Sequence, residues 1–261
     1  MIFLKSEQEI NKLRKANKIL AEILEKIGKV ASTSPGITTK ELDKLAEKLI
    51  LESGAKPAFK GYRGFPCSLC VSINEEVVHG IPNSSRKIQI GDIVSLDLGV
   101  KLDGYYGDSA ITVPVGKISD EVKKLIKITK NSLYKGIKQA RSGNRLSDIS
   151  YAIQSYTEEN GFSVVRDFTG HGIGRHLHEE PSIPNFGPPH RGIRLQKGMV
   201  LAIEPMVNMG SFKVKVLKNN WTVVTRDYKP SAHFEHTIAV TDNEPEILSI
   251  IKKDNNKDEK Q

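Results

Sequence analysis

Apolar residues recur every three or four positions in four segments, which is the pattern of amphipathic α-helices. The clearest segment is residues 7–30, where the apolar positions include Ile10, Leu13, Leu20 and Leu24. Hydroxyl side chains, which accept hydrogen bonds from the first free N–H groups of a helix, mark the starts of the other three. The predicted helices are residues 7–30, 39–52 (capped by Thr38 or Thr39), 120–141 (capped by Ser119) and 146–160 (capped by Ser147).

Shorter apolar or alternating runs predict β-strands between the helices. They lie near residues 68–78, 92–100 and 107–114, and in the second half near 163–168, 199–209, 212–217, 221–226 and 234–241. Helix pairs that alternate with antiparallel strand groups predict an α+β architecture. We expect both halves to place strands in one shared sheet, with the helices on one face.

Two of these strands share one arrangement: a glycine, an apolar run and then a carboxylate. An offset of 107 residues relates the two copies. The related positions are Gly36 and Gly143, Gly54 and Gly161, Gly91 and Gly198, and Asp97 and Glu204. A repeat of this length is a domain-sized duplication rather than a solenoid, whose period is about 20–50 residues. The sequence predicts two copies of one unit, each contributing an acid to the centre.

Asp97 stands in a strand that is apolar on both faces, where a charged side chain needs a partner. The turn dipeptide Asp103-Gly104 is expected to reverse the chain and to bring Asp108 opposite Asp97. Directly opposed side chains have Cβ atoms only about 4.5–5.5 Å apart, so two carboxylates there would repel each other. A bound cation removes this repulsion.

Glu204 and Glu235 repeat this arrangement, because they are symmetric about Asn219-Asn220. Prolines interrupt both arms, so one continuous hairpin is not expected. A single acid in an antiparallel sheet usually faces solvent, but for Asp97 that alternative is weak because its strand is apolar on both faces. For all four together it is weak, because burying four carboxylates without a metal would cost more free energy than folding provides.

Histidines supply a further ligand type. Residues 169–178 contain His171, His176 and His178 among glycines, which let the backbone approach a site closely. Carboxylates together with imidazole suit manganese, iron, cobalt or zinc, and two such ions about 3.5–4 Å apart would share bridging carboxylates. His79, which follows an apolar pair and precedes a Gly-containing turn, is ambiguous on its own.

The composition fits one large domain or two closely packed halves within 261 residues. No apolar run is long enough to cross a membrane, and the start is too short and charged for a signal peptide, so we expect a cytoplasmic protein without a membrane partner. Cys67 and Cys70 have the spacing of a redox pair or of half a zinc site. Because no second pair exists, a structural or pocket-lining role is favoured.

The net charge of +8 suits polyanions such as nucleic acid or a ribosome surface. The lysines are dispersed along the predicted helices, which favours solvated faces over a specific DNA-binding patch. Ribosome docking stays a hypothesis, and a monomer is expected because no surplus apolar helix face stands out. Residues 250–261 form a charged segment that we expect to be a disordered tail.

Six motifs, in order along the chain, resemble those of the bacterial type I methionine aminopeptidases. They are residues 74–82, 97–99, 107–110, 170–174, 204–205 and 235–237. The resemblance covers roughly residues 4 to 249 and implies the pita-bread fold, with two pseudo-symmetric α/β halves. We therefore expect residues 1–249 to form a single catalytic domain, with halves at about 7–114 and 115–249.

By this resemblance, five residues bind two divalent ions of cobalt, manganese, iron or zinc. The implied ligands are Asp97, Asp108, His171, Glu204 and Glu235, with Asp108 and Glu235 bridging the ions. Glu204 is also the family's candidate base, and His79 and His178 would contact the substrate. The implied pocket for the methionine side chain is lined by Tyr62, Phe65, Cys70, Leu177 and Trp221.

Two details of the resemblance bear on binding. Leu177 stands where an aromatic residue is common in the family, which predicts a methionine preference with shifted tolerance. Asn74 and Ser231 match a type of monovalent-cation site in the family, although Ser231 could equally be a turn residue.

The resemblance implies an enzyme that removes the initiator methionine from nascent proteins when the second residue is small. Since residue 2 is Ile, the chain should retain its own Met1. One alternative is a proline-specific relative, but those enzymes carry a sizeable N-terminal domain, whereas the catalytic half here begins almost at Met1. A type II enzyme would have a large insertion where only 31 positions separate Glu204 and Glu235. Another alternative is a metal-free binding protein of the same fold, in which the ligand set is degraded.

Overall fold

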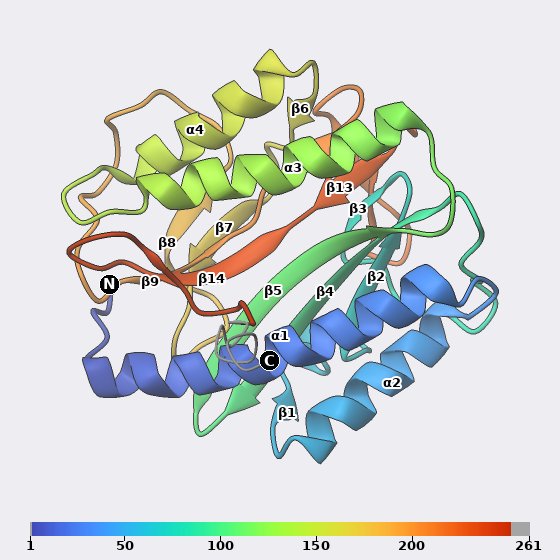
Figure 1. Ribbon diagram of the computed structural model, residues 1–261, viewed down its shortest axis with the longest axis horizontal. Coiled ribbons are helices and arrows are strands. Elements are labelled where there is room, and N and C mark those ends of the chain that lie inside the picture. Colours follow the sequence, from blue (N-terminus) through green and yellow to red (C-terminus); the bar gives the residue numbers. More distant parts are fainter. Residues whose placement is uncertain (1, 252–261) are drawn as a thin grey trace, which may run out of the picture.

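Two pairs of helices cover one face of a central sheet in the computed structural model, which describes residues 2–251 (Figure 1). The α-helices are α1 (Glu7–Thr33), α2 (Thr39–Glu52), α3 (Asp120–Gln139) and α4 (Leu146–Glu159), and η1 (Tyr62–Gly64) is a short 3-10 helix. The four predicted helices are confirmed, with ends shifted by up to three residues. Of the expected tail, residues 252–261 lie outside the described part of the chain.

Hydroxyl caps begin three of the predicted helices, the first of them α1, which Ser6 caps. Thr38, rather than Thr39, caps α2, because its hydroxyl accepts from the Glu41 amide while the Glu41 carboxylate accepts from the Thr38 amide. Ser119 caps α3 as predicted, since its hydroxyl accepts from the Val122 amide.

The cap predicted at Ser147 is wrong, because α4 begins one residue before it, at Leu146. The Asp148 carboxylate accepts a hydrogen bond from the Arg145 amide at this end of the helix. The Ser147 hydroxyl is used differently and accepts from the Arg191 amide, which ties a distant loop to α4.

The central sheet is antiparallel throughout. Its strands are β1 (Lys56–Pro57), β2 (Leu69–Ile73), β4 (Ile93–Leu102), β5 (Tyr105–Pro114), β7 (Thr169–Gly172), β8 (Glu179–Pro184), β9 (Val200–Ile203), β14 (Glu235–Ala239) and β15 (Glu246–Ile247). Their order is β1-β4-β5-β14-β9-β7-β8, with β2 also on β4 and β15 also on β14. The pair β5–β14 therefore joins the first half of the chain to the second.

Two smaller sheets complete the fold. One consists of β13 (Ser231–His233), β10 (Met206–Asn208) and β6 (Ser163–Val164), and the other of β11 (Val214–Val216), β12 (Val223–Thr225) and β3 (Glu76–Val78). The segment predicted as one strand at 68–78 is two strands, because the chain turns at Asn74, whose φ is 57°. The segment predicted at 199–209 breaks after Ile203, next to Pro205. Strands β7 and β8 were not expected, because glycines and a proline obscure their alternation.

The repeat is visible in the backbone. Gly36 and Gly143, related by the offset of 107, end equivalent turns with φ of 96° and 94°, in the left-handed region that favours glycine. The offset also relates two isolated bridges, Thr38 with Lys87 and Arg145 with Arg194. In Figure 1 the pair α1 and α2 packs on one half of the sheet and α3 and α4 on the other. The predicted fold of two pseudo-symmetric halves is confirmed.

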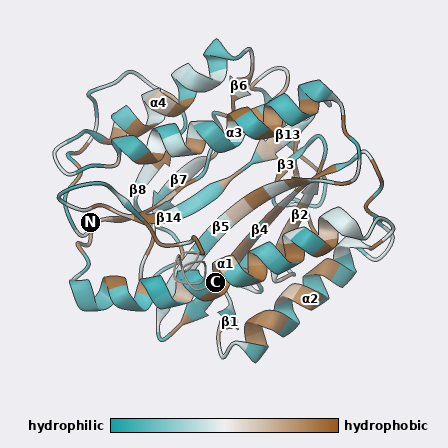
Figure 2. Ribbon diagram, viewed as in Figure 1, coloured by the Kyte–Doolittle hydropathy of each residue, from teal (hydrophilic) through white to brown (hydrophobic). Residues whose placement is uncertain are grey.

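The hydrophobic core fills the space between each helix pair and the sheet, and the helices alternate apolar and polar stripes (Figure 2). Leu96 and Leu98 of β4 are fully buried against the first helix pair, and Leu201 of β9 against the second. Since side chains alternate along a strand, the residues between these leucines point to the other face of the sheet. Asp97 is one of them.

Candidate metal centre and substrate pocket

One cavity of about 280 Å³ is lined by every side chain for which the sequence predicts a role in divalent-metal binding, catalysis or methionine binding. The predicted residues in its wall are Tyr62, Phe65, Cys70, His79, Asp97, Asp108, His171, Leu177, His178, Glu204, Trp221 and Glu235. They come from both halves of the chain. The cavity thus lies across the junction that β5 and β14 form.

The hairpin of β4 and β5 places two of the acids. Its turn is at Asp103-Gly104 as predicted, with Leu102 opposite Tyr105. The prediction that Asp97 and Asp108 directly oppose each other is wrong, because Asp97 pairs with Ala110 and Asp108 with Gly99. The two acids are diagonal neighbours on one face of the sheet, so their side chains still converge.

The second pair of acids comes from β9 and β14. His236 pairs with Ile203, and the same register extended by one residue brings Glu235 opposite Glu204. This is the register that the symmetry about Asn219-Asn220 predicts, although β10 to β13 intervene in the chain. Glu235 also pairs with Ala110, the residue that Asp97 pairs with from the other side. Ala110 therefore lies between Asp97 of the first half and Glu235 of the second half.

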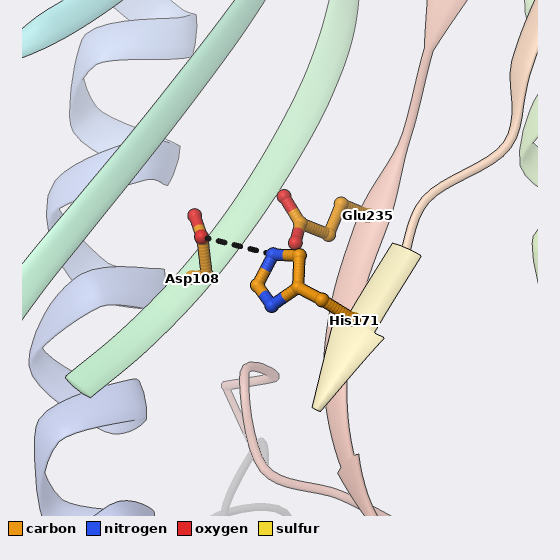
Figure 3. Close-up of side chains that lie close together, drawn as sticks. All are labelled: Asp108, His171 and Glu235. Carbon is orange, nitrogen blue, oxygen red and sulfur yellow. Dashed lines mark ion pairs between the residues drawn. The ribbon is translucent and has the colours of Figure 1, made fainter. Parts of the chain in front are cut away.

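His171 approaches these acids from β7. Its Nε2 lies 3.7 Å from Asp108 Oδ2 and 3.7 Å from Glu204 Oε1. Its Nδ1 lies 2.9 Å from the Gly172 carbonyl oxygen, which assigns the proton to Nδ1 and leaves the Nε2 lone pair directed at the acids. Figure 3 shows Asp108, His171 and Glu235 directed toward one another, and one ligand atom from each falls within a 4.8 Å group.

The acids suit cations because their buried oxygens lack other partners. Asp97 Oδ1, Asp108 Oδ1 and Glu235 Oε1 are buried without a hydrogen-bond partner among the described residues. Burial raises the pKa of Asp97 to about 7. Burial and then the charge of Asp97 raise the pKa of Asp108 and of Glu204 well above their usual range, and burial followed by repulsion from Asp108 does the same for Glu235. Divalent ions would stabilise all four as carboxylates.

Two imidazoles face the cavity beside this centre. His178 Nδ1 lies 2.8 Å from the Tyr62 hydroxyl oxygen, and its ring centroid is 4.2 Å from that of His171. The His79 ring meets the edge of Trp221, with centroids 6.2 Å apart. Partial burial is the main cause that lowers the pKa of His178 to about 3, and burial lowers that of His79 to about 4. Both rings are therefore neutral at pH 7.

Aromatic and aliphatic side chains form the rest of the wall. Phe65 and Trp221 make an edge contact with ring centroids 5.1 Å apart, and Leu177 is buried beside them. Cys70 is a free, buried thiol on β2, opposite Asp97, whereas Cys67 lies near Lys40, 3.6 Å from its Nζ. The two cysteines therefore face different surroundings, which supports the pocket-lining interpretation for Cys70.

Several residues of the site carry no sequence signal. The cavity is also lined by Phe59, Arg63, Val78, Phe168, Thr169 and Met206. These residues lie in loops or in very short strands, where no periodicity reveals their direction. His233 was also missed: its Nε2 lies 3.7 Å from Glu204 Oε2, and both of its ring nitrogens are buried without a partner among the described residues. Its position two residues before Glu235, on the same face of an extended segment, could have indicated it.

Asn74 and Ser231 lie together, as the predicted monovalent-cation site requires. The Asn74 carbonyl oxygen accepts from the Ser231 amide at 2.8 Å. The Ser231 hydroxyl lies 2.8 Å from Asn208 Oδ1, and the Asn74 side chain donates to Asp92. Oxygen atoms of several chain segments are thus gathered at this place.

The model of metallopeptidase family M24 matches residues 11–242. The chain belongs to this family. It is 58% identical over 252 residues to the methionine aminopeptidase of Clostridium perfringens, a match that covers 97% of this chain and 100% of that protein. It is 57% identical over 251 residues to methionine aminopeptidase 1 of Bacillus subtilis, with 96% and 100% covered. The resemblance drawn from the six motifs is confirmed.

The structure of this M24 metallopeptidase is also similar to solved structures of methionine aminopeptidases. It is similar to the methionine aminopeptidase of Thermotoga maritima, with a TM-score of 0.94, 47% identity and coverage of 96% of this chain and 100% of that chain. A prolidase from Pyrococcus horikoshii shares the fold, with a TM-score of 0.77 and 23% identity, but this chain covers only 64% of it. Over residues 2–251, no helix is long and apolar enough to cross a membrane.

Proposed function

We propose that this chain is a methionyl aminopeptidase, which removes the N-terminal initiator methionine from nascent proteins when the second residue is small. The observation that carries the proposal is the convergence of Asp97, Asp108, His171, Glu204 and Glu235 at one cavity of mixed aromatic and aliphatic walls. The high identity to full-length methionine aminopeptidases supports the substrate class.

These five side chains would hold two divalent ions of cobalt, manganese, iron or zinc. Such ions, when bound, supply an attacking water that is acidic enough to ionise near pH 7 and a hold on the substrate's free α-amino group. Glu204 takes the proton of the attacking water in this proposal. Its carboxylate oxygens lie 3.7 Å from His171 Nε2 and 3.7 Å from His233 Nε2.

The two histidines act on the scissile peptide bond. Because the Tyr62 hydroxyl can donate to His178 Nδ1, the neutral His178 ring keeps its proton on Nε2, from which it donates a hydrogen bond to the carbonyl oxygen as negative charge develops there. His79, held between Phe168 and Trp221, hydrogen-bonds the amide nitrogen that leaves.

The methionine side chain occupies the pocket of Tyr62, Phe65, Cys70, Leu177 and Trp221. A thioether gains from contact with ring edges, which Phe65 and Trp221 provide. Leu177 offers no ring, so the pocket is expected to accept unbranched aliphatic analogues of methionine more readily than an all-aromatic wall would.

The proposal extends to the domain organisation and the cellular setting of the protein. Residues 1–249 act as one catalytic domain with halves at about 7–114 and 115–249. A monovalent cation bound near Asn74 and Ser231 stabilises the loop that follows β2. The protein works as a cytoplasmic monomer that meets nascent chains, and its net charge of +8 supports docking at the ribosome. Co-sedimentation with ribosomes at increasing salt tests the docking.

Hydrolysis of a Met-Ala-Ser peptide tests the proposed function. The metal-free protein should be inactive, and each restored divalent ion should be assayed for recovery of methionine release. Asp97→Ala and Glu204→Ala should abolish the recovered activity, while Lys197→Ala, a change to an exposed ion pair with Asp242, should leave it intact. Activity that survives in both acid variants, or that no divalent ion restores, would contradict the proposal and favour a metal-free binding protein.

A further inference from the structure

Arg63 stands at the wall of the cavity in an exposed position. It is the middle residue of η1 and has a φ of 47°. The backbone around it is fixed by hydrogen bonds from the Gly61 amide to the Phe65 carbonyl and from the Phe65 amide to the Tyr62 carbonyl, at 2.8 and 2.9 Å. The loop therefore holds the start of this long side chain in one place beside the pocket.

Within the described part of the chain, the Arg63 guanidinium has no acid to neutralise it. No carboxylate of residues 2–251 comes within 4.0 Å of it, whereas Arg14, Arg141 and Arg175 each form such an ion pair. It lies over the Tyr62 ring, with its carbon 5.5 Å from the ring centroid, and this contact leaves its N–H groups available. Among the described residues that line the cavity, it is the only Lys or Arg.

The distance from the reacting bond to Arg63 fits a short stretch of substrate. The Tyr62 ring centroid lies 5.2 Å from that of His178, which is proposed to contact the carbonyl of the first residue, and 5.5 Å from the Arg63 guanidinium. Together these separations span about three residues of extended chain at most. A substrate that leaves the cavity past Tyr62 would bring its third or fourth side chain to Arg63.

We propose that Arg63 makes this enzyme selective for substrates with an acidic side chain at the third or fourth residue. This inference rests on the proposed aminopeptidase function and names a substrate class within it. A carboxylate there forms an ion pair with the guanidinium, whereas a lysine is repelled. Because the site is exposed, each effect is modest: a pair of this kind changes an equilibrium by up to about fivefold.

The test compares kcat/KM for amidated peptides Met-Ala-Xaa-Gly-Gly and Met-Ala-Gly-Xaa-Gly, in which Xaa is Glu, Gln or Lys. For one of the two positions, the native enzyme should prefer Glu to Lys by about threefold to tenfold, and the preference should shrink at high salt. In Arg63→Gln the ratio should fall to about 1, and in Arg63→Glu it should invert. Arg175→Ala, which removes an exposed arginine that is paired with Glu9 outside the cavity, should keep the native ratio.

Ratios between peptides in one variant cancel any general loss of folding or activity. If the native ratio of kcat/KM for Glu and Lys peptides is about 1 at both positions, or if the preference is unchanged in Arg63→Gln, the role of Arg63 is overturned. The proposed aminopeptidase function is not affected by that outcome. Failure to release methionine from the uncharged Gln peptides under any metal condition would instead overturn the proposed function, and this inference would fall with it.

Discussion

Lys5 Nζ lies 2.6 Å from Glu179 Oε2, and the two side chains are only 6% and 5% exposed. The other oxygen of Glu179 accepts from the His176 amide at 3.0 Å, so this carboxylate holds the turn that carries Leu177 and His178 into the cavity. The N-terminal segment thereby stabilises the part of the cavity wall that Leu177 and His178 form in the second half of the chain.

Replacement of Lys5 by Met should destabilise the protein, because it leaves the Glu179 carboxylate buried without its counter-ion. Breaking a buried pair from one side costs about 3–5 kcal/mol, measurable as a lower midpoint of urea unfolding. The double variant Lys5→Met/Glu179→Gln should recover much of the loss, since the amide needs no cation. Equal midpoints for the single and double variants would show that the pairing does not matter.

The stability of the metal-free protein should fall as the pH rises from 6.5 to 8. Burial raises the folded pKa of Asp97 to about 7 and also raises that of Asp108, so the folded protein retains protons that the unfolded chain has lost, and this stabilisation is lost as the pH rises through the folded pKa values. The buried histidines, with lowered pKa values, give the opposite slope, but only below their unfolded pKa of about 6.5.

Thermal unfolding at several pH values, with and without manganese, measures this dependence. Saturating manganese should raise the unfolding temperature most at pH 8, where it binds the carboxylate forms. Asp97→Asn should show a shallower pH slope in the metal-free state. A metal-free protein that is more stable at pH 8 than at 6.5 would rule out the proposed burial of these acids.

Tyr62→Phe should lower kcat about threefold to tenfold, with a smaller effect on KM. The change keeps the ring in the pocket and removes the hydroxyl that fixes the His178 tautomer, a hydrogen bond worth about 0.5–1.5 kcal/mol. Steady-state rates on Met-Ala-Ser measure it. A rise in KM at constant kcat would assign Tyr62 to methionine binding alone.

Leu177→Phe should sharpen discrimination between methionine and norleucine at the first position of a peptide. A ring at this buried position adds a sulfur–aromatic contact worth about 0.3–1.5 kcal/mol, which methionine gains and norleucine does not. The ratio of kcat/KM for the two peptides should rise about twofold to tenfold. Leu177→Met, which changes the side chain at the same position without adding a ring, serves as the matched control and should leave the ratio near its native value.

Sequence patterns were sufficient for much of the centre because its acids violate the local hydrophobic pattern. Asp97 and Glu204 each stand in an apolar run, at a position where the pattern calls for another hydrophobic residue. The register of the first hairpin was mispredicted by one residue per strand, yet Asp97 and Asp108 still share a face, since that error moves the pairing and not the alternation.

The rest of the site depends on tertiary contacts that no local pattern encodes. Arg63 and Phe168 reach the cavity from loops whose path is set by glycine turns and by packing against other segments. Strand β7, which carries His171, is not predicted from the sequence because glycine has a low strand propensity. Its glycines are needed because β8 and β9 approach its backbone closely. A Cβ atom at Gly170 would lie 2.4 Å from a backbone oxygen of β9, and one at Gly172 would lie 2.3 Å from a backbone oxygen of β8.

Metal stoichiometry measured together with peptide cleavage shows whether the five side chains form a catalytic metal centre. Anaerobically prepared metal-free protein should be titrated with manganese or cobalt, with bound metal counted per chain and Met-Ala-Ser hydrolysis followed in the same samples. We expect up to two ions per chain, hydrolysis that appears only with metal, and loss of both in His171→Ala combined with Glu235→Ala. Binding of no divalent ion, or methionine release that is independent of metal, would contradict this expectation.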